Sequence, residues 1–221
     1  MKVFCVIPAY NEEETINKVI DQVKKIVDKV IVVDDCSSDK TYKIAKNHKE
    51  VAVLKHIINR GQGASLQTGN EYALKNNADV VVHFDADGQF LAREIKDVIS
   101  PIINNKADVV FGSRFLEKKS DIPWFKEKVI INLARLVNRF FLKVNLTDPQ
   151  SGFRAFSQKA LRKIKIENDG MAHCSEILAK VFENNFRVKE IPITVIYYNF
   201  GQRFNGGLKI IKDLILGKLV N

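Results

Sequence analysis

Residues 80–89 read Val80-Val81-Val82-His83-Phe84-Asp85-Ala86-Asp87-Gly88-Gln89. A nearly continuous apolar run, rather than an alternation of apolar and polar residues, is typical of a strand that is covered on both faces of a sheet. Two carboxylates follow this run at once, separated by one small residue. The stretch therefore predicts a buried strand whose carboxyl end leads Asp85 and Asp87 into a polar loop.

Four further apolar runs flank this strand in the sequence, at residues 3–7, 30–33, 51–54 and 109–111. Between the runs, apolar residues recur at helical spacing over residues 12–27, 40–47, 64–76 and 92–103. Such alternation is typical of βαβ units with right-handed crossovers. We therefore predict an α/β fold with a mostly parallel, Rossmann-like central sheet, covered on both faces by helices.

Each of the first four predicted strands leads into a polar loop, at residues 8–13, 34–39, 59–63 and 85–89. A single loop of this kind has a structural explanation, since Ser38 and Asp39, for example, suit the cap of a helix. In an open parallel sheet, however, ligands bind outside the carboxyl ends of the strands, where all four loops meet. The sequence thus predicts a binding site at this edge.

The residue types in these loops indicate the ligand. Oxygen donors from Asp85, Asp87 and Gln89, with no cluster of cysteines and histidines nearby in the sequence, favour Mg²⁺ or Mn²⁺ shared with substrate phosphates. A nucleotide base and ribose are expected against the residues Tyr10, Glu12, Asp34 and Asp35. No GxGxxG follows the first strand, and the chain lacks GxxxxGK[ST]. We therefore predict a nucleoside diphosphate held with a divalent metal.

The chain of 221 residues is 46% apolar and carries a formal net charge of +9. Residues 1–113 hold 15 basic and 16 acidic side chains and residues 166–221 hold 7 and 6, whereas residues 114–165 hold 13 and 4. The positive excess therefore belongs to one quarter of the chain. A non-catalytic module that binds nucleic acid or another anion is an alternative. The near-neutral charge of residues 1–113 argues against it, and we expect no nucleic-acid partner.

The polar loops taken together resemble those of the family 2 glycosyltransferases, which have the GT-A fold. The resemblance rests on residues 8–12, 32–39, 59–63 and 85–87 in this order. The later motifs are similar to those of the dolichyl-phosphate mannose synthases and related polyprenyl-phosphate glycosyltransferases, and comprise Asp85–Gln89, Gly112–Arg114, Asp148–Arg154, Glu190–Ile193, and Arg203 six residues before Lys209. The resemblance extends over almost the whole chain.

The resemblance implies a role for each matching residue. The nucleotide pocket is expected to be lined by Pro8, Tyr10, Glu12, Val33, Asp34, Asp35, Asp85 and Ala86. The Mg²⁺ or Mn²⁺ ion is expected on Asp85, Asp87 and Gln89. Catalysis is expected to depend on Asp87 and on three cations that contact donor or acceptor phosphates, namely Arg114, Arg203 and Lys209. The implied reaction inverts the anomeric carbon of a hexose from GDP-mannose, UDP-glucose or UDP-GlcNAc and transfers it to a polyprenyl (dolichyl) phosphate.

A phosphate acceptor determines what the mechanism requires. A phosphate monoester is already an oxyanion at neutral pH, so it attacks without a general base, and positioning and electrostatics supply the catalysis. The alternative is a family 2 enzyme with a soluble or polysaccharide hydroxyl acceptor, which would need a base. Glu176 is the candidate for that base, although an acidic residue in the first turn of a helix also has a structural explanation.

A lipid acceptor would give the basic quarter of the chain a use. Residues 126–143 and 207–220 combine apolar and cationic residues in the manner of amphipathic helices at a membrane interface. Packing in the core or against a second copy is the alternative for these segments.

The expected organisation is a single domain over residues 1–221, with a nucleotide-binding half (1–113) and an acceptor-binding half (114–221). No run reaches the roughly 18 apolar residues of a transmembrane helix, and the N-terminus lacks the pattern of a signal peptide. The three cysteines are far apart in the sequence, which is typical of reduced thiols in a cytoplasmic protein. We expect peripheral attachment at the cytoplasmic face of the membrane, directly or through an anchoring partner or homodimer.

Overall fold

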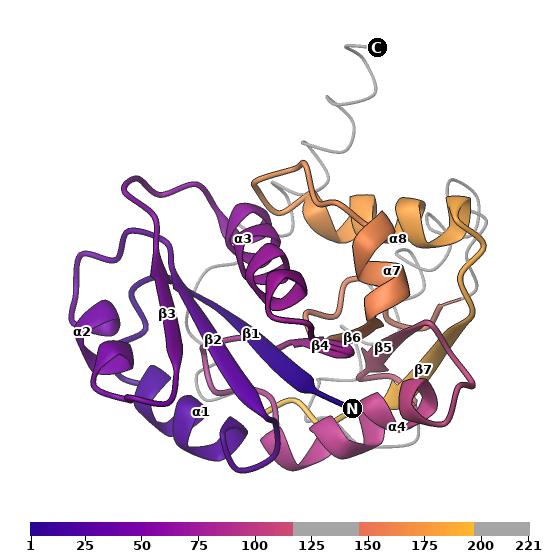
Figure 1. The fold of residues 1–221 in the computed structure, drawn as a ribbon, viewed down its shortest axis with the longest axis horizontal. Helices are drawn as coiled ribbons and strands as arrows, with labels where there is room; N and C mark the ends of the chain where they lie inside the picture. The colour runs from indigo at the N-terminus through magenta and orange to yellow at the C-terminus, as the bar shows by residue number, and fades with distance from the viewer. Residues whose placement is uncertain (117–145, 197–221) are drawn as a thin grey trace, which may run out of the picture.

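The computed structural model describes residues 1–116 and 146–196, which form alternating strands and helices (Figure 1). In chain order the elements are β1 (Val3–Ala9), α1 (Ile16–Val23), β2 (Lys29–Asp34), α2 (Thr41–Lys46), β3 (Ala52–Lys55), α3 (Gln62–Lys75), β4 (Val80–His83), η1 (Ala92–Glu94), α4 (Ile95–Ile103), β5 (Val109–Ser113), β6 (Arg154–Ser157), α7 (Gln158–Lys163), α8 (His173–Glu183) and β7 (Val188–Pro192).

The strands form one sheet in the order β3-β2-β1-β4-β6-β5-β7. Strand β6 is antiparallel to both of its neighbours, and the other pairs in the described residues are parallel. The predicted mostly parallel α/β sheet is therefore confirmed. All five predicted strands are present as β1 to β5, whereas β6 and β7 were not predicted from the sequence.

Two details of the prediction are wrong. The run at residues 51–54 was expected to be covered on both faces, but β3 is an edge strand with Ala52, Val53 and Leu54 only partly buried. The helix expected over residues 12–27 is shorter, because α1 begins at Ile16. The preceding residues form a loop that is bonded to α2, where the Glu12 amide donates to Thr41 Oγ1 at 2.7 Å.

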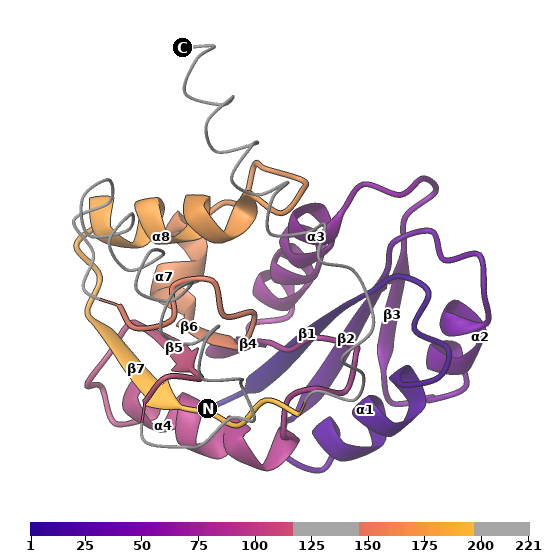
Figure 2. The ribbon, with the colours of Figure 1, turned by 180° about the vertical axis from the view of Figure 1, so that it is seen from behind.

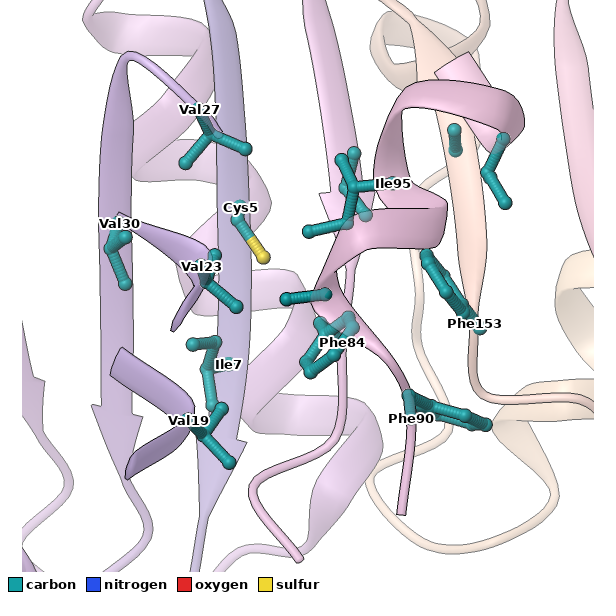
Figure 3. Close-up of a cluster of buried hydrophobic side chains, with 14 of the residues drawn as sticks. Cys5, Ile7, Val19, Val23, Val27, Val30, Phe84, Phe90, Ile95 and Phe153 are labelled. Atoms are coloured by element: carbon teal, nitrogen blue, oxygen red, sulfur yellow. The ribbon is translucent and has the colours of Figure 1, made fainter. Parts of the chain in front are cut away.

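Helices cover both faces of the sheet, with α1, α2 and α4 on one side and α3, α7 and α8 on the other (Figures 1 and 2). Successive strand residues point to opposite faces. In β1, Cys5 and Ile7 belong to the core on the α1 side, whereas Phe4 and Val6 belong to the core on the α3 side. Figure 3 shows the first of these cores. Burial on both faces explains why β1 reads as a continuous apolar run.

Helix α3 packs unusually close to the sheet because small residues dominate its buried face. A Cβ added to Gly69 would lie 2.3 Å from Val6 Cγ1 of β1. This close approach fixes α3, and with it the loop that enters the helix at the carboxyl end of the sheet. Within the described residues, no helix combines the length and the apolar character that crossing a bilayer requires.

We expect Gly69→Ala to lower the free energy of unfolding by about 1–3 kcal/mol, because the new methyl group overlaps Val6. This loss exceeds the gain of up to about 1 kcal/mol that alanine brings to a helix interior. Urea unfolding measures the change. The matched control is Gly170→Ala, where an added Cβ meets no atom within 4 Å, and equal stability of the two variants would contradict the steric argument.

Candidate active site

A pocket of about 490 Å³ opens at the carboxyl ends of the parallel strands. Loops after β1, β2, β3 and β4 form its walls, together with the first turn of α3 and the segment before α8. The lining residues are Pro8, Ala9, Tyr10, Glu12, Asp35, Asn59, Gly61, Gln62, Ser65, Asp85, Ala86, Asp87, Gly170 and Met171. The structure thus brings the four polar loops together around one cavity.

Most of the residues predicted for a nucleotide and metal site line this pocket, namely Pro8, Tyr10, Glu12, Asp35, Asp85, Ala86 and Asp87. Val33 and Asp34 are fully buried and do not belong to the lining. Gln89 lies beside the carboxylates, and its backbone amide donates to Asp87 Oδ1 at 2.9 Å. Arg203 and Lys209 lie outside the described residues, so their roles stay predictions.

The end of β4 directs two carboxylates into the pocket. Phe84 is buried in the core, and the next three residues, Asp85, Ala86 and Asp87, all line the cavity. Gln62 at the start of α3 donates from Nε2 to Asp85 Oδ1 at 3.0 Å. The Asp85 carboxylate is therefore held in place by the start of α3.

The segment at residues 148–154 closes over Asp85 from the other side. A Cβ added to Gly152 would lie 2.4 Å from Asp85 Oδ2, so only glycine leaves room for the carboxylate. Gly152 belongs to the motif Asp148–Arg154, but no role was predicted for it from the sequence. Its contact explains why a residue without a side chain is needed there.

Burial raises the pKa values of both Asp85 and Asp87. Desolvation raises the pKa of Asp85 to about 7, and the Asp87 carboxylate adds to this rise, whereas Arg154 opposes it. Desolvation also raises the pKa of Asp87. Two desolvated carboxylates that repel one another are stabilised by a divalent cation.

The donor set fits Mg²⁺ or Mn²⁺, since such ions take one or two carboxylates and complete their shell with water and substrate phosphates. The residues that would hold such an ion are Asp85 and Asp87, with Gln89 beside them. Among residues 1–116 and 146–196, no three His, Cys, Asp or Glu side chains form a cluster that could hold a metal.

The Asp35 carboxylate organises another wall of the pocket. Its Oδ1 accepts from His56 Nδ1 at 2.7 Å and from the Arg60 amide at 2.9 Å, and its Oδ2 accepts from the Gly61 amide at 2.6 Å. Gly61 has a φ of 106°, a conformation that favours glycine. One buried carboxylate thus ties the end of β2 to the loop that enters α3.

Arg114 is held outside the pocket lining by a bidentate ion pair. Its Nε and one terminal nitrogen donate to the two oxygens of Asp148 at 2.6 and 2.8 Å. The backbone of that partner is held in turn, because the amides of Thr147 and Asp148 donate to Glu190 Oε1 at 2.8 and 3.0 Å. The motif residues around positions 114, 148 and 190 are therefore one connected network.

Glu176 fixes the segment that supplies Gly170 and Met171 to the pocket. Its carboxylate accepts from the amides of Glu167 at 2.9 Å and Asn168 at 2.8 Å, and it also pairs with Lys180 at 2.7 Å. Glu176 is not part of the pocket lining. These contacts favour the structural explanation of this residue over a role as a general base.

A buried polar cluster behind Asp85 has no counterpart in the sequence-based prediction. Arg154 is fully buried, and one terminal nitrogen donates to Cys174 Sγ at 3.0 Å. Desolvation raises the pKa of Cys174, but Arg154 and His173 outweigh this effect and lower it to about 6. Desolvation lowers the pKa of His83 well below its ordinary value, so this imidazole is neutral. Arg154 therefore brings a positive charge near Asp85 from within the core, and the Cys174 thiolate opposes its effect on the pKa of Asp85.

Several pocket residues were missed from the sequence. Gln62 and Asn59 belong to a loop that was recognised as polar, but nothing in their spacing showed which of them faces the cavity. Gly170 and Met171 follow no predicted strand, and they reach the pocket because the Gly63 amide donates to the Asp169 carbonyl at 2.8 Å. Only the folded chain reveals this contact.

A model of the family described as "Glycosyl transferase family 2" matches residues 4–165. The chain belongs to this family. It is therefore a glycosyltransferase, and the resemblance seen in the polar loops is confirmed.

Relatives of known name agree with this assignment. The chain is 35% identical to UDP-N-acetylglucosamine–dolichyl-phosphate N-acetylglucosaminyltransferase of Methanococcus voltae, over 98% of this chain and 96% of that protein. It is 29% identical to undecaprenyl-phosphate mannosyltransferase of Micrococcus luteus, over 94% and 89% of the two chains. Among solved structures, glucosyl-3-phosphoglycerate synthase of Mycobacterium tuberculosis superposes with a TM-score of 0.76 at 20% identity, covering 97% of this chain and 77% of that one. The expected GT-A fold is confirmed.

In this glycosyltransferase, Glu176→Gln should loosen the pocket wall at residues 167–171. The substitution keeps the shape of the side chain, but glutamine has only one acceptor oxygen, so one of the two hydrogen bonds from the Glu167 and Asn168 amides is lost and the other becomes a neutral bond about half as strong. We expect amide hydrogen exchange at Glu167 and Asn168 to accelerate about tenfold, with global stability nearly unchanged. Glu183→Gln, at the exposed end of the same helix, is the control. Identical exchange in both variants would show that Glu176 does not hold this segment.

Proposed function

We propose that this glycosyltransferase catalyses the metal-dependent, inverting transfer of a hexose from a nucleoside diphosphate sugar to a polyprenyl phosphate. The observation that carries the proposal is the pair of desolvated carboxylates, Asp85 and Asp87, in a pocket beside the half-exposed ring of Tyr10. The carboxylates suit a metal-bound diphosphate, and the ring suits a base. We further propose that residues 1–113 bind the donor and residues 114–221 the acceptor.

We assign different roles in donor binding to different pocket residues. Tyr10 offers a face for stacking, while Asp35 holds the loop that carries Asn59 and Gly61 into the lining. A bound Mg²⁺ or Mn²⁺ would offset the charge that grows on the departing nucleoside diphosphate. Gln62 orients Asp85 for this purpose through its hydrogen bond.

A lipid phosphate acceptor is supported by the two named relatives, whose names specify dolichyl phosphate and undecaprenyl phosphate. An acceptor of this kind supplies its own oxyanion, so the anomeric carbon can be attacked without a general base. Asp148 pre-orients Arg114, and we propose that Arg114 contacts a phosphate together with Arg203 and Lys209. We further propose that the reaction takes place at the cytoplasmic face of the membrane.

The names of the relatives differ in the sugar, so the donor remains to be determined among GDP-mannose, UDP-glucose and UDP-GlcNAc. Each labelled donor, incubated with the chain, Mg²⁺ or Mn²⁺ and a polyprenyl phosphate, tests the proposal directly. We expect one donor to transfer its label into the organic phase. Label that reaches only a water-soluble acceptor would support the alternative of a hydroxyl acceptor, and would overturn the lipid assignment.

We expect Asp87→Asn to lower metal-dependent turnover by at least about 100-fold, because a neutral amide binds a divalent cation poorly and the metal contributes several kcal/mol to the barrier. Thermal unfolding should change little, since the side chain faces the pocket. The control is Asp97→Asn on the exposed side of α4. Wild-type turnover in Asp87→Asn would refute the metal assignment.

Metal affinity should depend on pH. A proton on Asp85 competes with the cation, and the pKa of this carboxyl is about 7, so the binding form is depleted as the pH falls below that value. Between pH 8 and pH 6, we expect the affinity for Mn²⁺ alone to fall about tenfold, as measured by electron paramagnetic resonance of the free ion. An affinity that stays constant over this range would contradict the raised pKa.

A further inference from the structure

Exposed apolar side chains gather around the pocket. Among the described residues, the large hydrophobic side chains left exposed include four that follow strand ends or border the pocket, namely Tyr10, Ile57, Ile58 and Met171. Ile57 is 94% exposed and Ile58 is 63% exposed. Adjacent exposed isoleucines are unfavourable in water, and in soluble proteins contiguous apolar surface marks a contact with another phase or molecule.

The loop that carries these isoleucines is anchored at both ends. His56 on one side and Arg60 and Gly61 on the other bind the buried Asp35 carboxylate through three hydrogen bonds of 2.6 to 2.9 Å. We call residues 56–61 the tip loop. Its projection between β3 and α3 is visible in Figure 1. Because its ends are fixed, the two isoleucines are held outward and lose little further entropy when another surface covers them.

The same loop leads directly into the pocket. Asn59 and Gly61, within one to three residues of the isoleucines, belong to the lining. The Asn59 amide group donates to the Asp35 carbonyl at 3.3 Å, and Gly61 packs against the Asp169 carbonyl. Whatever covers the isoleucines therefore lies beside the entrance used by the substrates.

The charge around the tip indicates the chemistry of that surface. Residues 55–61 include Lys55 and Arg60 and contain no acidic residue. Both cationic side chains are nearly half exposed, at 43% and 47%. Each also has an acidic neighbour, Asp34 at 4.0 Å from Lys55 and Asp169 at 3.2 Å from Arg60. An apolar tip between two cations complements the headgroups and upper acyl chains of an anionic bilayer.

We propose that the tip loop inserts Ile57 and Ile58 into the interface of an anionic phospholipid membrane and so holds the pocket entrance against the bilayer. This contact lies outside the amphipathic segments predicted from the sequence. The proposal rests on the proposed function for its purpose, since a lipid-linked acceptor is presented at the bilayer surface. The contact itself is measured without any sugar transfer.

The test compares Ile57→Ser/Ile58→Ser with Ile103→Ser in the full chain. Ile103 is 45% exposed and is the last residue of α4, outside the tip loop, so it matches the chemistry of the change and leaves the tip loop unchanged. Vesicles of phosphatidylcholine with phosphatidylglycerol are titrated against each protein, and sedimentation measures the bound fraction. We expect the double variant to bind about tenfold more weakly, because two isoleucines no longer leave water, whereas Ile103→Ser binds as the wild type does.

Transfer assays extend the test. With polyprenyl phosphate embedded in the same vesicles, the double variant should need about tenfold more lipid for half-maximal rate, while its rate with a water-soluble short-chain prenyl phosphate should match the wild type. Equal vesicle binding by wild type and double variant would overturn the proposal. So would dissociation of a wild-type dimer by the double substitution with vesicle binding unchanged, because a second copy would then cover the tip. Weaker vesicle binding by the double variant, in a chain that transfers no sugar to any prenyl phosphate, would support the membrane contact and reject the proposed function.

Discussion

Parallel pairing of β3, β2, β1 and β4 is the constraint on which the site depends. Parallel strands place all their carboxyl ends at one edge, so four loops that are distant in the sequence have to meet there. The pocket is lined from every one of them. Burial of β1, β2 and β4 on both faces enforces this arrangement, because a shift of one residue would exchange the cores on the two sides of the sheet.

The position of α3 turns this edge into a shaped cavity. Its small residues let it approach β1 closely, and its first turn then delivers Gln62 to Asp85. Asp35 fixes the loop before the helix, and the carbonyl of Asp169 accepts from the first amides of the helix. Because these contacts fix α3, Gln62 has a defined position from which it orients Asp85. A carboxylate that is to hold a metal needs a partner that orients it in this way.

The sequence was informative where the physical signal is local. Strands β1 to β5 follow from apolar runs, and Asp85 and Asp87 follow from their place directly after one of them. Strand β6 is as short as β3 and β4 but contains Arg154 and Ser157, so it lacks the continuous apolar run that predicted those two strands. The contact of Gly152 with Asp85 and the reach of Met171 to the pocket depend on tertiary packing, for which the sequence carries no periodic signal. Val33 and Asp34, which were also predicted for the nucleotide pocket, are fully buried and do not belong to the lining.

In the proposed function, the acidic pocket gives the basic excess of residues 114–165 a role. Within the described residues, the lining includes four acidic side chains, Glu12, Asp35, Asp85 and Asp87, and no basic one. An anionic diphosphate cannot enter such a cavity unless cations enter with it or surround it. A divalent ion would offset part of this negative charge. Residues 114–165, with 13 basic and 4 acidic side chains, contain cationic side chains that could offset the rest. Arg114, in this quarter, is paired with Asp148, and Arg154, also in this quarter, is buried where its charge lowers the pKa of Asp85. We propose that phosphate binding depends on the metal and on both parts of the chain together, because the pocket lining is acidic and the excess of basic side chains lies in residues 114–165.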